Sequence, residues 1–200
     1  MDIQRFIGGN LEANGYVITS RSGGECFIID PGYRPGVFLR DVETRKLKPL
    51  GILLTHHHDD HTGAVNRLRR EWDCPVYLHR LDAYVWPSDV DVYLEGGETL
   101  DLGGEEIQVI HTPGHTRGGV CFMAPESRVC FTGDTIFNVD LGRTDLDDGS
   151  PEDMEKTIRE IIDRWPNDLR IYPGHGDDCT MKTVRKINRE FLEIVEGGRE

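Results

Sequence analysis

The chain alternates short apolar runs with turns rich in glycine, proline and serine, and each run has the length of a strand or of one helix face. Two of these runs, YVITS and CFIID, flank the turn SGGE and predict a hairpin. The run GILLT is apolar throughout, which is typical of a buried strand. The first half therefore predicts strands at 16–20, 26–30, 51–55 and 75–79, helices at 37–47 and 64–72, and an irregular segment at 82–98.

The second half repeats this pattern. Ser150 as N-cap, Pro151 in the first helical position and acidic residues directly after them predict the start of a helix. The predicted strands lie at 98–104, 105–114, 118–125, 128–134 and 169–176, and the predicted helices at 151–165 and 182–195. Two blocks of strands, each followed by helices, indicate an α/β fold in which two sheets pack together with helices outside.

Length and charge restrict the class of protein. Two hundred residues with no linker or repeat predict a single domain over residues 1–200. No apolar run approaches the roughly 20 residues of a membrane span, and no secretion signal is visible, so a cytoplasmic enzyme without membrane contact is expected. The net charge of −13 disfavours a nucleic-acid partner. The five cysteines form no C-x-x-C pair and predict buried thiols; only Cys121 and Cys130 would lie opposite each other if PES turns a hairpin.

Histidines and acids gather at predicted junctions between strands and loops, where a rigid scaffold holds side chains that stay open to substrate. In HHHDDH, residues two apart point the same way, so His56 and His58 suit one metal ion and Asp60 and His61 a second. Imidazole with carboxylate suits zinc, iron or manganese. The expected site contains two divalent ions, with zinc as the first choice, and seven ligands: His56, His58, Asp60, His61, His115, Asp134 and His175.

The residues around these ligands resemble a known family. H-x-H-x-D-H at 56–61, followed by GHT, GD and PGH, is similar in order and spacing to the metallo-β-lactamase superfamily over nearly the whole chain. The strings HTPGHT, GDTIF and PGHG resemble its glyoxalase II-like branch. The resemblance implies a four-layer αββα sandwich with two mixed sheets and metals at one edge. It also implies that His56, His58 and His115 bind the first metal, that Asp60, His61 and His175 bind the second, and that Asp134 bridges them.

A hydrolytic mechanism follows from two adjacent cations, which activate water as hydroxide and polarise a carbonyl group. The expected activity is therefore glyoxalase II-like hydrolysis of a small thioester or related acyl compound, as in a hydroxyacylglutathione hydrolase. Asp60 would orient the nucleophile as well as bind metal. Arg143 would hold a substrate carboxylate, since a guanidinium pairs well with such groups, although an ordinary surface ion pair is an equal alternative.

Three features keep other functions open. The chain has only 25 residues after His175, too few for the helical domain of true glyoxalase II enzymes, and LGRTDL stands where those enzymes carry a lysine and a tyrosine. The string GRTD is shared with persulfide dioxygenases, whose single Fe(II) would here be held by His56, His115 and Asp134. Nuclease activity is a second rival, which the acidic charge opposes. A non-catalytic binding or redox partner protein is a third, which the complete set of expected ligands opposes. Asp30 is either a turn acid or a partner of the metal ligands.

Overall fold

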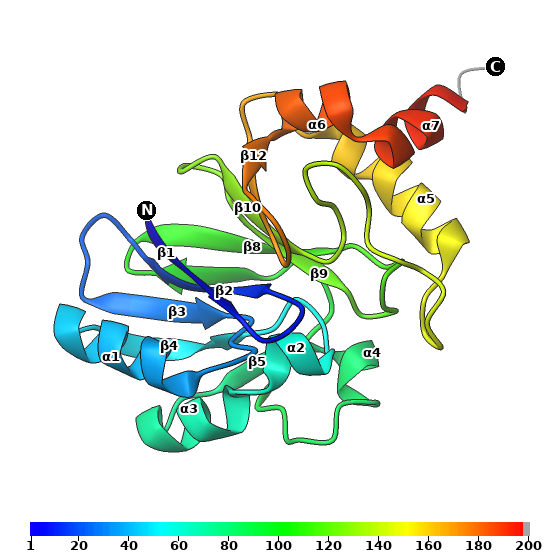
Figure 1. Cartoon of the computed structure of the whole chain (residues 1–200). Coiled ribbons are helices and arrows are strands. Elements are labelled where there is room, and N and C mark those ends of the chain that lie inside the picture. Colours follow the sequence, from blue (N-terminus) through cyan, green and yellow to red (C-terminus); the bar gives the residue numbers. More distant parts are fainter. Residues whose placement is uncertain (198–200) are drawn as a thin grey trace.

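The computed structural model describes residues 1–197 of the chain, in which two six-stranded sheets pack face to face (Figure 1). The first sheet has the strand order β1-β2-β3-β4-β5-β6, and both parallel and antiparallel neighbours occur in it. Its strands are β1 (Asp2–Gly8), β2 (Ala13–Thr19), β3 (Glu25–Ile29), β4 (Lys48–Leu53), β5 (Val76–His79) and β6 (Val92–Leu94).

The second sheet follows the first in the sequence and has the order β12-β11-β10-β9-β8-β7. It is also mixed, because β10 runs parallel to β11 but antiparallel to β9. Its strands are β7 (Thr99–Leu102), β8 (Glu105–His111), β9 (Val120–Ala124), β10 (Val129–Gly133), β11 (Arg170–Pro173) and β12 (Cys179–Thr180).

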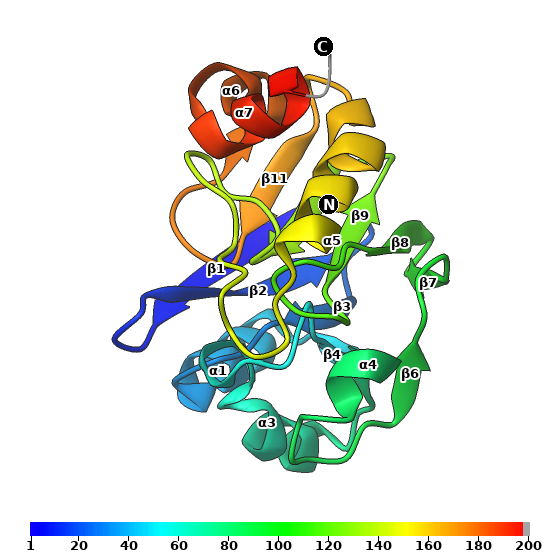
Figure 2. The ribbon, with the colours of Figure 1, turned by 90° about the vertical axis from the view of Figure 1, so that its right-hand side faces the viewer.

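Helices cover the outer face of each sheet, so the molecule has the four αββα layers that were predicted (Figures 1 and 2). Helices α1 to α4 lie with the first sheet, and α5 to α7 lie with the second (Figure 2). Their bounds are α1 (Pro35–Arg45), α2 (Asp59–Thr62), α3 (Val65–Trp72), α4 (Arg80–Ala83), α5 (Pro151–Glu160), the short 3-10 helix η1 (Ile162–Arg164), α6 (Met181–Ile187) and α7 (Arg189–Gly197). None of the helices in residues 1–197 has the length and apolar character needed to span a bilayer.

Alternation along the strands divides the apolar side chains among three layers of core. Tyr16 and Ile18 of β2 point between the sheets, whereas Val17 points outward toward α1 and α3. In the second sheet, Phe122 faces the first sheet, and Cys121 faces the layer under α5 to α7. Each sheet is therefore buried on both faces, which accounts for the nearly continuous apolar runs of the central strands.

The cysteines are all free and buried, as the sequence predicted for thiols. Residues 125–128 do turn β9 into the antiparallel β10, but Cys130 pairs with Met123 in the register. Cys121 and Cys130 are therefore not opposite each other, because the turn offsets the two strands. Burial raises the pKa of Cys26 to about 12, so that thiol stays protonated at neutral pH.

The structure corrects three predictions of local structure. The first strand, β1, was not predicted; it is a half-exposed edge strand without a strong apolar pattern. The segment 82–98, predicted to be irregular, contains the three-residue strand β6. The predicted helix at 182–195 is broken at Asn188, whose backbone is extended. The Asn188 Oδ1 atom accepts a hydrogen bond from the Phe191 N–H, and this contact caps α7.

Candidate metal centre

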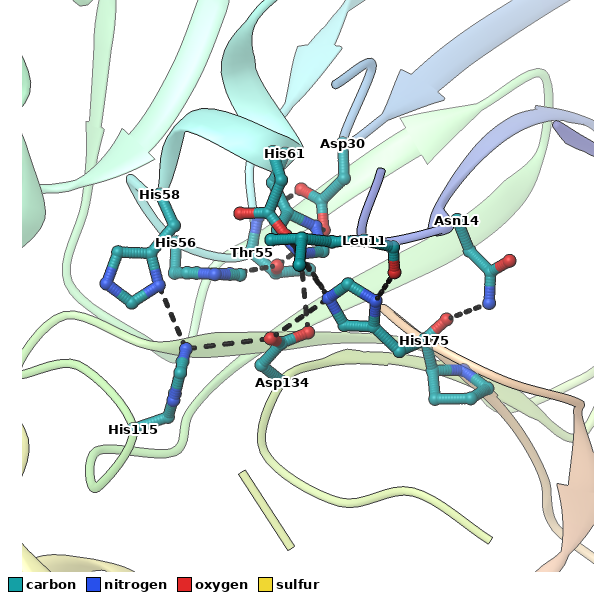
Figure 3. A network of polar contacts seen from close by, with 12 residues as sticks. Leu11, Asn14, Asp30, Thr55, His56, His58, His61, His115, Asp134 and His175 are labelled. Carbon is teal, nitrogen blue, oxygen red and sulfur yellow. Dashed lines mark hydrogen bonds and ion pairs between the residues drawn. The ribbon is translucent and has the colours of Figure 1, made fainter. Parts of the chain in front are cut away.

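The seven predicted ligands converge at one end of the two sheets, although they come from four separate segments. Figure 3 shows this for all of them except Asp60. The first segment runs from the end of β4 into α2 and carries four of them. The others follow β8, β10 and β11, so each is held where a strand of the sandwich ends. Gly174 makes the last approach possible, because a Cβ atom there would collide with the Asp134 carboxylate.

Three histidines form the first group of ligand atoms. One nitrogen each from His56, His58 and His115 lies within 4.8 Å of the other two. The His58 Nδ1 and His115 Nε2 atoms are 3.0 Å apart, and the ring centroids of His56 and His58 are separated by 4.8 Å. These three side chains point toward a common centre from two loops that are 57 residues apart in sequence.

The second group contains Asp60, His61 and His175, whose ligand atoms also lie within 4.8 Å of one another. The Nε2 atoms of His61 and His175 are 3.3 Å apart. The Asp60 Oδ2 atom lies 3.3 Å from His175 Nε2 and 3.6 Å from His61 Nε2. This group brings α2 of the first sheet's layer against the end of β11 in the second sheet.

Asp134 lies between the two groups and reaches both. Its Oδ1 atom is 3.4 Å from His61 Nε2 in the second group. Its Oδ2 atom is 3.6 Å from His115 Nε2 in the first group and 3.4 Å from His175 Nε2. A carboxylate in this place is suited to bridge two cations, as the family resemblance implied.

Four of the histidines, His56, His61, His115 and His175, are oriented by a hydrogen bond on the ring nitrogen that faces away from the centre. The His115 Nδ1–H donates to the Arg143 carbonyl at 2.7 Å. The His175 Nδ1–H donates to the Leu11 carbonyl at 3.0 Å (Figure 3). His61 Nδ1 lies 3.3 Å from Asp30. Since these acceptors require a proton on Nδ1, the Nε2 lone pairs are directed into the centre.

Asp30 anchors the segment that carries the first four ligands through hydrogen bonds with Thr55. The carboxylate of this residue accepts hydrogen bonds from the backbone N–H of Thr55, at 2.8 Å, and from the Thr55 hydroxyl. That hydroxyl then accepts from His56 Nδ1, 3.0 Å away. Because Asp30 also contacts His61, one buried carboxylate orients a histidine in each group. The sequence left Asp30 as either a turn acid or a partner of the expected ligands. These contacts show that it is a partner of the expected ligands.

Two observations show that the residues present fit a pair of metal ions. Within residues 1–197, His56 Nε2 and Asp134 Oδ1 are buried without a hydrogen-bond partner, and an unpaired polar atom is costly to bury. Ligands about 2.1 Å from a tetrahedral metal are spaced by about 3.4 Å. The contacts among the ligand atoms, at 3.0, 3.3, 3.4 and 3.6 Å, match that spacing.

The electrostatics of the two groups also suit cations. Burial lowers the pKa of His56 well below its ordinary value, and burial followed by the charges of neighbouring imidazoles lowers that of His58 to about 4. Burial also lowers the pKa values of His61 and His175. Neighbouring carboxylates, of which Asp134 has the largest effect, outweigh burial and raise these pKa values to about 8 for His61 and about 10 for His175. The second group thus attracts positive charge, and metal binding there would displace protons.

The remaining candidate residues lie around the centre. The Arg143 guanidinium, expected to hold a substrate carboxylate, makes a two-pronged ion pair with Asp145: Nε to Oδ1 at 2.7 Å and Nη2 to Oδ2 at 2.8 Å. His57 turns away from the centre and contacts Asp82. Two further histidines, His79 and His111, stack on each other with ring centroids 4.3 Å apart.

Sequence reasoning missed Asp82, which ties the two ligand loops together. Its buried carboxylate accepts hydrogen bonds from the backbone N–H of His57, at 3.1 Å, and from the Gly118 N–H, at 2.6 Å. It also accepts from the Thr116 hydroxyl, next to His115. Nothing in the string LHRLD signals this role, because both partner segments are at least 25 residues away.

The fold and the paired ligand groups define a class of metal-dependent enzymes, and comparison with known proteins agrees. The model of the metallo-beta-lactamase superfamily matches residues 8–175. The chain therefore belongs to the metallo-beta-lactamase superfamily.

Three related proteins illustrate the range of similarity. A Mycobacterium leprae protein, ML0493, is 36% identical over 96% of this chain and 99% of its own length. The probable metallo-hydrolase YqgX of Bacillus subtilis is 31% identical over 90% of this chain and 92% of its own. The hydroxyacylglutathione hydrolase of Dechloromonas aromatica is 35% identical over 90% of this chain, which spans 62% of that longer protein.

Two solved structures resemble the fold closely. The BLEG-1 B3 metallo-beta-lactamase superposes with a TM-score of 0.87 and 29% identity, covering 95% of this chain and 99% of its own. TTHA1623, solved in a di-iron-bound form, has a TM-score of 0.84 and 34% identity, with coverage of 94% and 99%.

Proposed function

We propose that this protein is a dinuclear metal-dependent hydrolase of a thioester or related acyl compound. The observation that carries the proposal is the position of Asp134 between two complete ligand groups. A mononuclear iron site would need only His56, His115 and Asp134, and it would leave the convergence of Asp60, His61 and His175 without a role. The relatives named metallo-hydrolase and hydroxyacylglutathione hydrolase support this choice.

A substrate has room beside the ligands. A cavity of about 540 Å³, which is in the usual range for small-molecule sites, is lined by five of the expected ligands, by apolar side chains and by the charged residues Asp59 and Arg143. When bound, two divalent ions, expected to be zinc, would lower the pKa of a water molecule and polarise a carbonyl group. Hydrolysis would add the water oxygen to the carbonyl carbon and break the carbon–sulfur bond, giving a carboxylate and a thiol.

Asp60 is the residue best placed to orient the attacking water. It lines the cavity, and its Oδ2 atom lies 3.3 Å from His175. Burial raises the pKa of Asp60, but the hydrogen bond to His175 and the charge of His61 outweigh burial and hold the value at about 2. The carboxylate is therefore ionised at neutral pH, where it accepts a hydrogen bond from water and does not act as a general acid.

Hydrolysis of a panel of acyl thioesters, including a hydroxyacyl-glutathione, tests this proposal. We expect turnover by protein purified without chelator, a loss of at least about 100-fold after metal removal, and recovery when zinc is restored. Thiol release with a chromogenic disulfide reports the rate. Consumption of O₂ with glutathione persulfide and no thioester hydrolysis would instead identify an iron dioxygenase.

A further inference from the structure

The cavity beside the ligands continues toward the outer helices. Its apolar wall contains Leu11, Phe137, Leu141 and Leu146, and Leu11 is 64% exposed at the tip of the β1–β2 hairpin. A second cavity, of about 550 Å³, adjoins it and shares Leu141 and Arg143 in its lining. A substrate bound at the metal ligands would therefore lie against apolar side chains and extend past Arg143.

Away from the metal ligands, acidic side chains outnumber basic ones in the second cavity, which such a substrate would enter. Among the described residues that line the two cavities, Arg143 and Arg159 are the only lysines or arginines. Arg143 is paired with Asp145, and Arg159 with Glu155 at 2.8 Å. The remaining acids of the second cavity are Asp140, Glu190 and Glu193, and no guanidinium pairs with them in residues 1–197.

The pair between Arg143 and Asp145 occupies the two guanidinium nitrogens, Nε and Nη2, that could bind a carboxylate in a two-pronged manner. The Arg143 Nε atom lies 2.7 Å from Oδ1 of Asp145, and the Arg143 Nη2 atom lies 2.8 Å from Oδ2. A substrate carboxylate that used the same two nitrogens would have to displace Asp145 and would then lie near its released negative charge. Since like charges placed together cost free energy, the pair selects against anions although a guanidinium is present.

We propose that the site takes an uncharged acyl thioester or ester whose apolar group packs on Leu11, Phe137 and Leu146. We further propose that Asp145, by occupying Arg143, disfavours anionic substrates. The inference rests on the proposed hydrolase function and narrows its substrate class. Asp145 is not a member of either ligand group, and in the proposed complex it would not touch the reacting carbonyl group. It is a specificity-determining residue that acts through Arg143.

Two hexanoyl thioesters that differ in one group provide the test. Their thiol parts are 3-mercaptopropionamide, which is neutral, and 3-mercaptopropionate, which carries one negative charge. We expect the metal-loaded wild-type protein to have a kcat/KM at least about five-fold higher for the neutral thioester. In Asp145→Asn the ratio of the two kcat/KM values should shift about five-fold toward the anion.

Asp168→Asn is the matched control, because Asp168 also pairs with an exposed arginine, Arg128. These two residues precede β11 and β10, so they lie at the opposite ends of those strands from Asp134 and His175. The control variant should keep the wild-type ratio. A wild-type preference for the anionic thioester, or an equal shift in both variants or in neither, would overturn the inference.

The two proposals fail in different ways. If neither thioester is hydrolysed, the proposed hydrolase function is wrong for this substrate class, and the intact compounds can be titrated calorimetrically into the same proteins. The ratio of the two Kd values then replaces the kinetic ratio, with the same expected shifts. Absence of measurable binding by both compounds would overturn the inference as well.

Discussion

Replacing His58 with alanine should abolish hydrolysis and leave the fold intact. His58 contributes its Nδ1 atom to the first ligand group, 3.0 Å from His115 Nε2, and belongs to none of the three apolar clusters. Removing a direct ligand should cost more than the 10- to 100-fold typical of its hydrogen-bonded partners, so we expect kcat/KM to fall by about 1,000-fold or more. Thioester turnover and far-UV circular dichroism measure the two effects.

His111→Ala is a suitable control for the loss of an imidazole. His111 lies outside the two ligand groups and contacts the Arg117 carbonyl at 2.9 Å. Its replacement should change kcat/KM by only a few-fold. Turnover at the wild-type rate in His58→Ala, with metal content unchanged, would refute the assignment of His58.

Asp30→Ala should produce the second large effect, on stability and on metal affinity together. The change leaves the Thr55 N–H and the Nδ1 atom of His61 without their buried acceptor, and the residue has a left-handed backbone with φ of 46°. Loss of a charged acceptor in the interior should lower the free energy of unfolding by about 3 kcal/mol. Metal affinity should fall about 10- to 100-fold, because two ligands lose their orientation.

Urea unfolding of the metal-free proteins and competition with a chromophoric chelator measure these two quantities. Asp73→Ala is the matched control, since Asp73 has a φ of 47° but is exposed at the end of α3. It should show only the strain of an alanine in the left-handed region, about 1 kcal/mol. Equal losses in the two variants would mean that backbone strain, and not the buried hydrogen bonds, explains the effect.

The convergence of the seven predicted ligands could be expected from the sequence because most of the signal is local. Four ligands lie within six residues directly after an apolar strand, and the other three stand beside glycines at strand ends. The layers were also predictable, since both sheets are buried on two faces and their strands are apolar.

The parts that were missed depend on contacts between distant segments or on weak local patterns. Asp82 is connected to the ligand loops only in space. The break at Asn188 depends on a side chain that donates to the Phe137 and Asp140 carbonyls as well as capping α7. Propensity alone continues a helix through such a residue.

Metal content tests the central claim most directly. The protein should be purified without chelator, and its metals should be identified and counted per chain by mass spectrometry. Two groups of ligands joined by Asp134 predict two divalent transition-metal ions per chain, expected to be zinc, and a loss of bound metal in Asp134→Ala. A single iron per chain, unchanged when the second group is disrupted by His175→Ala, would contradict the dinuclear centre.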